Sequence, residues 1–155
     1  MERKEKLIEN KNIDIDEFKL KTFHITSPYF KLLFENNIRK ITLDKYTGKR
    51  AVITYEVHID SKSSNPLGIV HGGAIGTLFE SLTDLTIYYL GNTRYRTQDI
   101  AINYKSHVDL NSTILVKLNI HKINYPTTFI NAELIKDGEV CSSASIIKTK
   151  LEPKF

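Results

Sequence analysis

The sequence predicts an α+β fold in which one antiparallel sheet wraps around a single long buried helix, with additional helices at the N-terminus. Residues 72–90 are apolar over most of a helix surface, so this helix is expected to be covered on nearly every side. Residues 38–60 and most of the chain after residue 98 instead alternate with the period of a strand. A lone apolar helix beside a single sheet is buried only if the sheet wraps around it.

The first 37 residues are expected to form an amphipathic helical extension. Apolar side chains recur at roughly helical spacing between Leu7 and Leu20, and a second group follows the Ser27-Pro28 pair. Residues 38–155 are expected to form the main domain. The chain has 155 residues and no linker or repeat, so it is long enough for one domain and too short for two comfortable ones.

The main domain is expected to begin with a hairpin whose two strands flank the turn Tyr46-Thr47-Gly48. A polar loop containing Asn65-Pro66 leads to the buried helix, which is expected to end at Gly91-Asn92. Asp137-Gly138 is a strong hairpin turn between the last two strands. Strands are therefore expected over residues 99–107, 113–123, 127–136 and 139–150.

Composition excludes several classes of protein. Cys141 is the single cysteine, so no internal disulfide can form, which suits a reducing compartment. No apolar run is long enough to span a bilayer, and the N-terminus mixes acids with bases, unlike a signal or transit peptide. A cytoplasmic protein is expected, with an organelle as the alternative. The net charge of +4 comes from scattered residues without a nucleic-acid motif, so an anionic small molecule is the expected partner.

Glu80 and Asp84 are the only charged residues between Gly72 and Leu90. They lie four positions apart, on one face of the expected helix. A buried carboxylate is costly, and two close carboxylates raise at least one pKa, which suits general-base or nucleophilic chemistry. The alternative is structural: one or both reach the surface or a dimer interface and accept hydrogen bonds there.

Two glycines, Gly72 and Gly73, open the same helix. Glycine lets a ligand approach the backbone closely, and the free N–H groups at a helix N-terminus stabilise developing negative charge. Such groups would form an oxyanion hole if aimed at a thioester carbonyl. The alternative is a tight turn that binds no ligand.

The window Asn65–Glu80 resembles the signature of the hotdog thioesterase superfamily, in its phenylacetate-degradation and thioesterase superfamily member 2 types. The shared pattern is an Asn or Gln, a His-Gly-Gly turn at His71, and an Asp or Glu further along the helix. The resemblance implies a hotdog fold and an acyl-CoA thioester as substrate, with no separate cofactor. It also implies a homodimer, with a dimer of dimers as a further possibility.

The resemblance also implies roles for individual residues. Glu80 matches the catalytic acid, Gly72 the amide that polarises the thioester oxygen, and Asn65 the side chain that places the substrate carbonyl or the attacking water. Thr97 matches a hydroxyl residue that assists the acid. In the family, the glycine turn and the acid facing one substrate come from different subunits. Many members carry Asp at the Glu80 position and a hydroxyl residue at the Asp84 position, so general base versus nucleophile stays open, as does the role of Asp84.

Further residues are expected at the substrate. His71 is interpreted as a structural donor that holds the turn, with proton transfer as the alternative. Strand ends and turns beside the dimer interface are expected to meet the CoA nucleotide, with lysines as point charges for phosphate. The expected substrate-binding set is His71, Gly73, Asp84, Tyr104, Lys105, Lys122 and Tyr125, with the strand end Lys148–Lys150.

Other chemistries find less support. His24, His58, His107 and His121 lack metal-ligand spacing, so no metal site is expected. The Gly-x-Ser-x-Gly elbow of a serine hydrolase is absent. Two alternatives to the thioesterase stay open on the same fold: a hydroxyacyl dehydratase or hydratase, although its usual His-Phe-Pro turn is missing, and a non-catalytic acyl-CoA-binding dimer.

Overall fold

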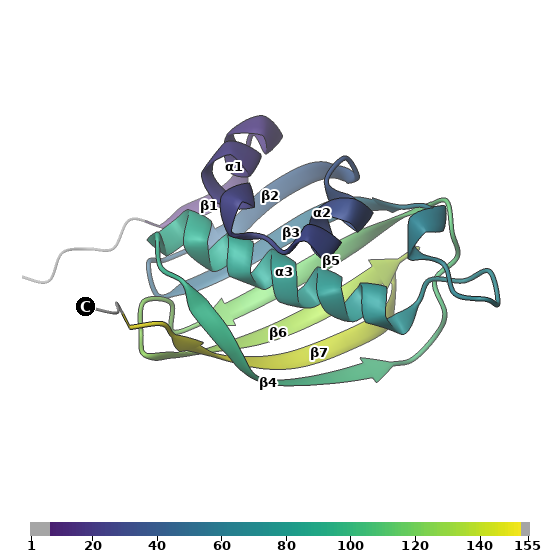
Figure 1. The fold of residues 1–155 in the computed structure, drawn as a ribbon. Helices are drawn as coiled ribbons and strands as arrows, with labels where there is room; N and C mark the ends of the chain where they lie inside the picture. The colour runs from purple at the N-terminus through teal and green to yellow at the C-terminus, as the bar shows by residue number, and fades with distance from the viewer. Residues whose placement is uncertain (1–6, 153–155) are drawn as a thin grey trace, which may run out of the picture.

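A seven-stranded sheet curves around the helix α3, Gly72–Gly91, in the computed structural model, which describes residues 7–152 (Figure 1). Every neighbouring pair of strands is antiparallel. The predicted α+β architecture is therefore confirmed. In spatial order the strands are β1 (Ile8–Asn12), β2 (Ile38–Tyr46), β3 (Arg50–Ile59), β5 (Ser112–His121), β6 (Thr127–Lys136), β7 (Glu139–Lys150) and β4 (Tyr95–Tyr104).

The helix α3 is the centre of the hydrophobic core, as its sequence predicts. Its apolar side chains face the sheet on one flank and the N-terminal helices on the other, which explains why apolar residues cover so much of its surface. Asn92 ends the helix in the left-handed conformation, with φ of 51°, and its N–H donates to the Tyr88 carbonyl. The buried members of α3 are Ala74, Ile75, Leu78, Phe79, Leu82, Thr83, Leu85, Thr86 and Ile87.

The N-terminal extension differs from its prediction at one point. Residues 8–12 form the strand β1, which pairs with β2 from Ile8 opposite Tyr46 to Asn12 opposite Thr42, so the helix expected there was wrong. A five-residue segment is too short for its apolar spacing to distinguish a helix from an edge strand. The expectation for residues 1–6 falls outside the described residues.

Two short helices follow β1, as the sequence predicts. In α1, Ile15–Thr22, the Asp14 side chain caps the first turn, and in α2, Pro28–Phe34, Ser27 does the same. Figure 1 shows both helices on the flank of α3 that lies toward β2 and β3, opposite the edge strand β4. The extension and the main domain share one core, because the buried side chains of α1 and α2 belong to the same cluster as those of α3.

The edge strand β4 begins earlier than its alternation predicts. It runs from Tyr95 rather than Asp99, and its pairing with β7 shifts register between Thr97 and Asp99. This bulge interrupts the alternation, so Thr97 and Ile100 both face inward although three positions separate them. The outer edge of β4 has no partner strand among the described residues.

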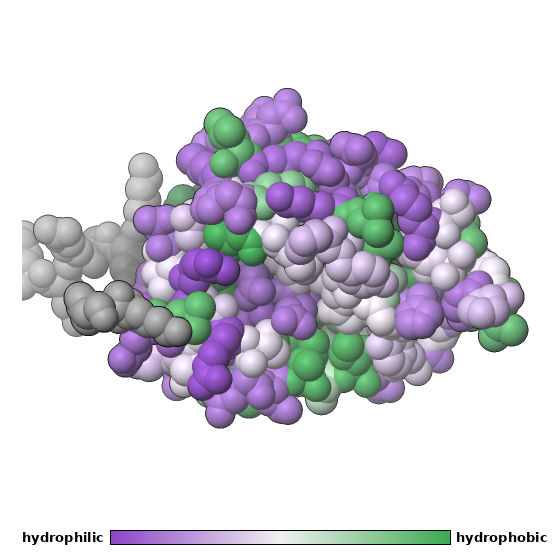
Figure 2. All heavy atoms as spheres, viewed as in Figure 1, coloured by the Kyte–Doolittle hydropathy of each residue, from purple (hydrophilic) through white to green (hydrophobic). Residues whose placement is uncertain are grey.

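In the view of Figure 1, the surface is largely hydrophilic, but hydrophobic side chains gather below α3 along β4 (Figure 2). Two of the side chains that β4 contributes to the core, Ile100 and Ile102, are only partly buried in one chain. An unpaired edge beside partly covered apolar groups is typical of a sheet that continues into a second copy. Between residues 7 and 152, no helix is long and apolar enough to cross a membrane.

Candidate active site

The first turn of α3 is held by the imidazole ring of His71, the N-cap residue. Its Nδ1 accepts a hydrogen bond from the Gly73 N–H at 2.8 Å, and the backbone N–H of His71 donates to the Ser63 carbonyl at 2.7 Å. The expected role in holding the turn is met, but the ring is an acceptor rather than the donor that was expected, because a helix N-terminus presents N–H groups. The Gly73 N–H is therefore occupied.

Gly72 occupies the first position of α3, where a backbone N–H has no acceptor within the helix. Among residues 7–152, the Gly72 N–H donates to no acceptor outside the helix either. The Tyr104 hydroxyl donates to the Gly72 carbonyl at 2.9 Å, and a Cβ added to Gly72 would lie 3.3 Å from that ring. Any larger residue at this position would crowd the aromatic side chain of β4, which crosses directly over the backbone.

Asn65 lies in the loop before α3 and uses only half of its amide group. Its Oδ1 accepts from the N–H groups of Leu67 at 2.9 Å and Ile69 at 3.2 Å, which folds the loop into a tight turn. The Nδ2 group has no bonded acceptor within the described part of the chain. An amide oxygen that holds the loop thus leaves two N–H donors in a fixed direction.

Asn65 and Gly72 line one cleft of about 380 Å³ at the N-terminal end of α3, which we call the donor cleft. Tyr104, the last residue of β4, and Lys105, which follows it, line the same cleft, so four of the predicted site residues meet here. Both of these side chains are exposed. The remaining residues that line the donor cleft are Ile69, Val70, Ile75, Ser106, His107 and Val108.

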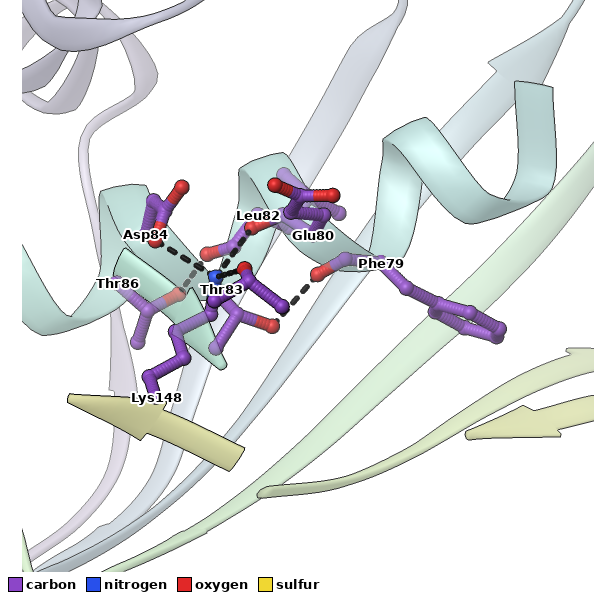
Figure 3. Close-up of polar contacts among 8 residues, drawn as sticks. Phe79, Glu80, Leu82, Thr83, Asp84, Thr86 and Lys148 are labelled. Carbon is purple, nitrogen blue, oxygen red and sulfur yellow. Dashed lines mark hydrogen bonds and ion pairs between the residues drawn. The ribbon is translucent and has the colours of Figure 1, made fainter. Parts of the chain in front are cut away.

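Glu80 and Asp84 line a second cleft of about 340 Å³ in the middle of α3, which we call the acid cleft. The wall opposite α3 comes from the segment Ile25–Tyr29 of the N-terminal extension. The sequence left open whether Glu80 is buried or reaches the surface; its side chain is exposed in the single chain because it points away from the sheet (Figure 3). The other α3 residues that line the acid cleft are Thr77, Ser81 and Leu85.

Beneath the acid cleft lies a buried lysine that the sequence interpretation assigned differently. Lys148 of β7 is 0 % exposed, and its Nζ donates to Asp84 Oδ1 at 2.7 Å, to Thr97 Oγ1 at 2.9 Å and to the Glu80 carbonyl at 3.4 Å (Figure 3). Lys148 was expected near the CoA phosphates, but its ammonium group faces α3 from below. The period-two pattern of β7 could have revealed this, since Ala144, Ile146 and Lys148 all face inward.

The pKa of the Asp84 carboxyl is raised above its ordinary value by burial. The nearby charge of Glu80 raises this pKa further, while the ammonium group of Lys148 opposes both effects. Asp84 is therefore a carboxyl with a perturbed protonation equilibrium. The Glu80 side chain is the one of the two that is exposed to solvent.

Two of the predicted substrate-binding residues lie apart from both clefts. Lys122 and Tyr125 are exposed in the turn between β5 and β6, where the Tyr125 N–H donates to the Lys122 carbonyl at 3.3 Å. This turn lies beside the C-terminal end of α3, because Asn124 approaches Gly91 there. Within one chain it is thus at the opposite end of the helix from the donor cleft.

The two clefts are separated along α3. Gly72 and Glu80 are eight residues apart, which corresponds to about 12 Å of helix at about 1.5 Å per residue. A single thioester carbonyl is too small to contact both within one chain. Among residues 7–152, no group of three or more His, Cys, Asp or Glu side chains is arranged to hold a metal ion.

Comparison with solved structures identifies the class of fold. A hypothetical thioesterase from Streptococcus pneumoniae, solved with coenzyme A, is 21% identical at a TM-score of 0.58, over 66% of this chain and 81% of its own. Thioesterase superfamily member 2 from Mus musculus is 20% identical at 0.59, over 72% and 82%. The candidate thioesterase yhdA from Lactococcus lactis is 14% identical at 0.68, over 77% and 96%.

These likenesses show that the chain has the hotdog fold, which confirms the fold that the Asn65–Glu80 window implied. Of the three structures described above, one is named a thioesterase superfamily member and the other two are described as thioesterases. No protein-family model matches the sequence.

Proposed function

We propose that the protein hydrolyses an acyl-CoA thioester to a free acid and CoA, with Glu80 as general base or nucleophile and the Gly72 amide as oxyanion donor. The observation that carries this proposal is the pairing of unoccupied N–H donors in the donor cleft with a solvent-exposed carboxylate in the acid cleft of the same helix. Thioester hydrolysis needs both: a donor for the developing oxyanion and an acid–base or nucleophilic group beside it. Thioesterases of the same fold, one of them solved with coenzyme A, add support.

We infer that the two clefts meet across a homodimer, formed alone or within a dimer of dimers. If two copies join their sheets edge to edge through β4, a two-fold axis turns the second copy's acid cleft toward the first copy's donor cleft. The partly covered apolar side chains of β4 support this arrangement, as does its unpaired edge. Glu80, exposed in one chain, would then face Gly72 and Asn65 of the other.

The chemistry follows from these groups. As a general base, the Glu80 carboxylate removes a proton from a water molecule that attacks the thioester carbon; as a nucleophile, it attacks that carbon itself and water later cleaves the anhydride. The carbonyl oxygen becomes an oxyanion, stabilised by the Gly72 N–H and by Nδ2 of Asn65. The C–S bond then breaks, and the CoA thiolate takes up a proton as it leaves.

The acyl group would lie in the acid cleft and the CoA at the donor cleft. Lys105 is exposed beside the donor cleft, where its ammonium group can contact a phosphate as a point charge. The acid cleft is bounded by Ile25 and Tyr29 of the N-terminal extension, so this extension would limit the size of the acyl group. The acid cleft is lined by both polar and apolar side chains, which favours an acyl group that is not purely aliphatic.

Release of free thiol from a panel of acyl-CoAs tests the proposal. The wild-type protein is expected to release thiol, and Glu80→Gln is expected to lower kcat by at least about a hundredfold, since it removes the base or nucleophile. Its fold should survive, because the Glu80 carboxylate makes no hydrogen bond among the described residues. Glu35→Gln, a change at an exposed carboxylate of the extension, is the matched control and should leave kcat unchanged.

Each alternative gives its own result in this assay. A dehydratase or hydratase would convert a hydroxyacyl-CoA or an enoyl-CoA without releasing thiol, and a binding protein would retain acyl-CoA unchanged. Near-normal turnover by a folded Glu80→Gln protein would show that Glu80 is structural and that the proposed mechanism is wrong.

A further inference from the structure

The buried ammonium group of Lys148 has a use beyond neutralising a carboxylate. Lysine is almost never fully buried unless it is paired, because removing a charge from water is costly. Here each of its three N–H donors has one acceptor: Asp84 Oδ1, Thr97 Oγ1 and the Glu80 carbonyl oxygen. Only the first of these acceptors is charged, so the ion pair alone does not account for where the side chain lies.

The contact with Thr97 fixes the direction of a second hydrogen bond. An ammonium group donates and never accepts, so Thr97 Oγ1 must be the acceptor in the 2.9 Å contact. The hydroxyl hydrogen of Thr97 then points away from Lys148. Because Thr97 is only half-buried, this hydrogen remains available as a donor to a group outside the sheet.

The contact of Lys148 with the Glu80 carbonyl links β7 to the helix α3. Lys148 lies on β7 and is paired in register with Thr97 on β4, so one side chain joins two strands to the turn of α3 that carries the proposed catalytic acid. The bulge of β4 between Thr97 and Asp99 is what turns Thr97 inward at this point. The Glu80 main chain and the Thr97 hydroxyl are thereby bonded to the same ammonium group.

We propose that Lys148 is a positioning residue: it orients the Thr97 hydroxyl as a hydrogen-bond donor to the water or thioester at Glu80, and it fixes the Glu80 turn against β4. This proposal rests on the proposed thioester hydrolysis. Lys148 touches no substrate atom, and it acts on the reaction through Thr97 and the backbone of Glu80.

A double-mutant cycle on kcat tests the orientation of Thr97. Thr97→Val is expected to lower kcat about tenfold in the wild-type background, and Lys148→Met by a similar factor, with KM changed less than twofold. Combining them should cost little more than either change alone, because without Lys148 the hydroxyl is no longer directed. Thr97→Ser, which keeps the hydroxyl, should retain most of the wild-type kcat.

A second set of variants separates positioning from folding, since Lys148→Met alone leaves Asp84 without its cation. Lys148→Met with Asp84→Leu removes both charges, and it should recover most of the melting temperature that Lys148→Met loses. Its kcat should still lie about tenfold below that of Asp84→Leu alone. Lys117→Met, at an exposed lysine of β5, is the control and should change neither quantity.

Two outcomes overturn the proposal. Equal kcat values for Asp84→Leu and for the Lys148→Met, Asp84→Leu variant would make Lys148 a purely structural counter-charge, as would additive effects of Thr97→Val and Lys148→Met. If the wild-type protein releases no thiol, it is the proposed function that fails. The same cycle is then measured on the affinity for a non-hydrolysable thioether analogue of acyl-CoA, where additive effects would again overturn the role of Lys148.

Discussion

The donor cleft and the acid cleft lie along one helix but offer opposite kinds of hydrogen-bonding group. In the donor cleft, the Asn65 Oδ1 and the His71 Nδ1 accept hydrogen bonds that hold the loop, and within residues 7–152 the N–H donors at Gly72 and Asn65 have no acceptor. In the acid cleft, the buried donors of Lys148 are used up on Asp84 and its neighbours, and the Glu80 carboxylate is left exposed. Each cleft therefore lacks the kind of group that the other offers.

The strand β4 serves both clefts. Thr97, near its start, is bonded to Lys148 below the acid cleft, and Tyr104, at its end, covers Gly72 in the donor cleft. Among residues 7–152, the same strand is one of the two edges of the sheet, and β1 is the other. In the proposed dimer, the strand that shapes both clefts is also the one through which the second copy joins, so assembly and completion of each site would be coupled.

The largest expected effect comes from mixing two variants, each defective in one cleft. Asn65→Asp keeps the acceptor that holds the loop but removes the amide donors, and Glu80→Gln removes the acid. Each protein alone should be nearly inactive. If one site draws Asn65 and Glu80 from different chains, a mixed dimer has one intact site and should show about half of the wild-type turnover.

This experiment needs proof that subunits exchange. Differently tagged variants, co-purified after brief denaturation and refolding, provide it, and wild-type protein given the same treatment sets the reference activity. Sedimentation should show at least a dimer at micromolar concentration. A stable active monomer, or exchanged dimers without recovered activity, would show that both clefts of one site belong to the same chain.

A smaller effect is expected when the donor cleft alone is crowded. Gly72→Ala adds a Cβ 3.3 Å from the ring of Tyr104, which displaces either the ring or the amide that faces the cleft. We expect kcat to fall about tenfold, within the range for a misplaced oxyanion donor. Gly76→Ala is the matched control, because its Cβ would crowd Ile102 of the same strand at 3.2 Å, one turn away from the free N–H.

Alanine should raise helix propensity more at Gly76, inside the helix, than at Gly72, its first residue. Melting temperatures therefore report on the fold of each variant, and kcat reports on the donor cleft. Equal losses of kcat in the two variants would mean that crowding against β4, rather than the Gly72 amide, controls turnover.

The smallest expected effect concerns pH and the acid cleft. Burial raises the pKa of Asp84, and Lys148 opposes that rise, so Lys148→Met should raise this pKa further. A carboxyl with a raised folded-state pKa destabilises the protein fully above that pKa, and the cost is relieved as pH falls toward the unfolded-state value. The stability deficit of Lys148→Met should therefore be larger at pH 8 than at pH 5, by about 1 kcal/mol.

Denaturant unfolding at both pH values measures this difference, with Lys148→Met, Asp84→Leu as the control that should lose the pH dependence. If Lys148→Met loses the same unfolding free energy at pH 5 and at pH 8, the ionisation of Asp84 is not the cause of that loss.

The sequence was most informative in the segments where neighbouring residues determine both the local structure and the proposed site. The window from Asn65 to Glu80 specifies a loop, a glycine turn and a helix within a short stretch, so the fold and the donor cleft could be predicted from it. The helix boundaries and the strands β6 and β7 followed from hydrophobic period and from the turn at Asp137-Gly138. These features depend on residues close together in the chain.

Features that depend on distant pairing were not predicted. The strand β1 exists because β2 accepts it as a neighbour, which five residues of sequence do not reveal. Lys148 meets Asp84 across 64 positions and Thr97 across 51, so its partners follow from sheet register rather than from its own surroundings. The bulge in β4 also concealed that Thr97 belongs to this strand, since it broke the alternation that would have marked the strand.

The group formed by Lys148, Asp84 and Thr97 also constrains how this sequence can evolve. Replacing Lys148 first leaves a carboxylate without its cation, and replacing Asp84 first leaves an ammonium group buried without a counter-charge. Every single-step path away from the group thus passes through a less stable protein. We expect related sequences either to keep all three residues or to have replaced all three. The three residues should therefore be conserved together within a group of related proteins, more strictly than the exposed Glu80.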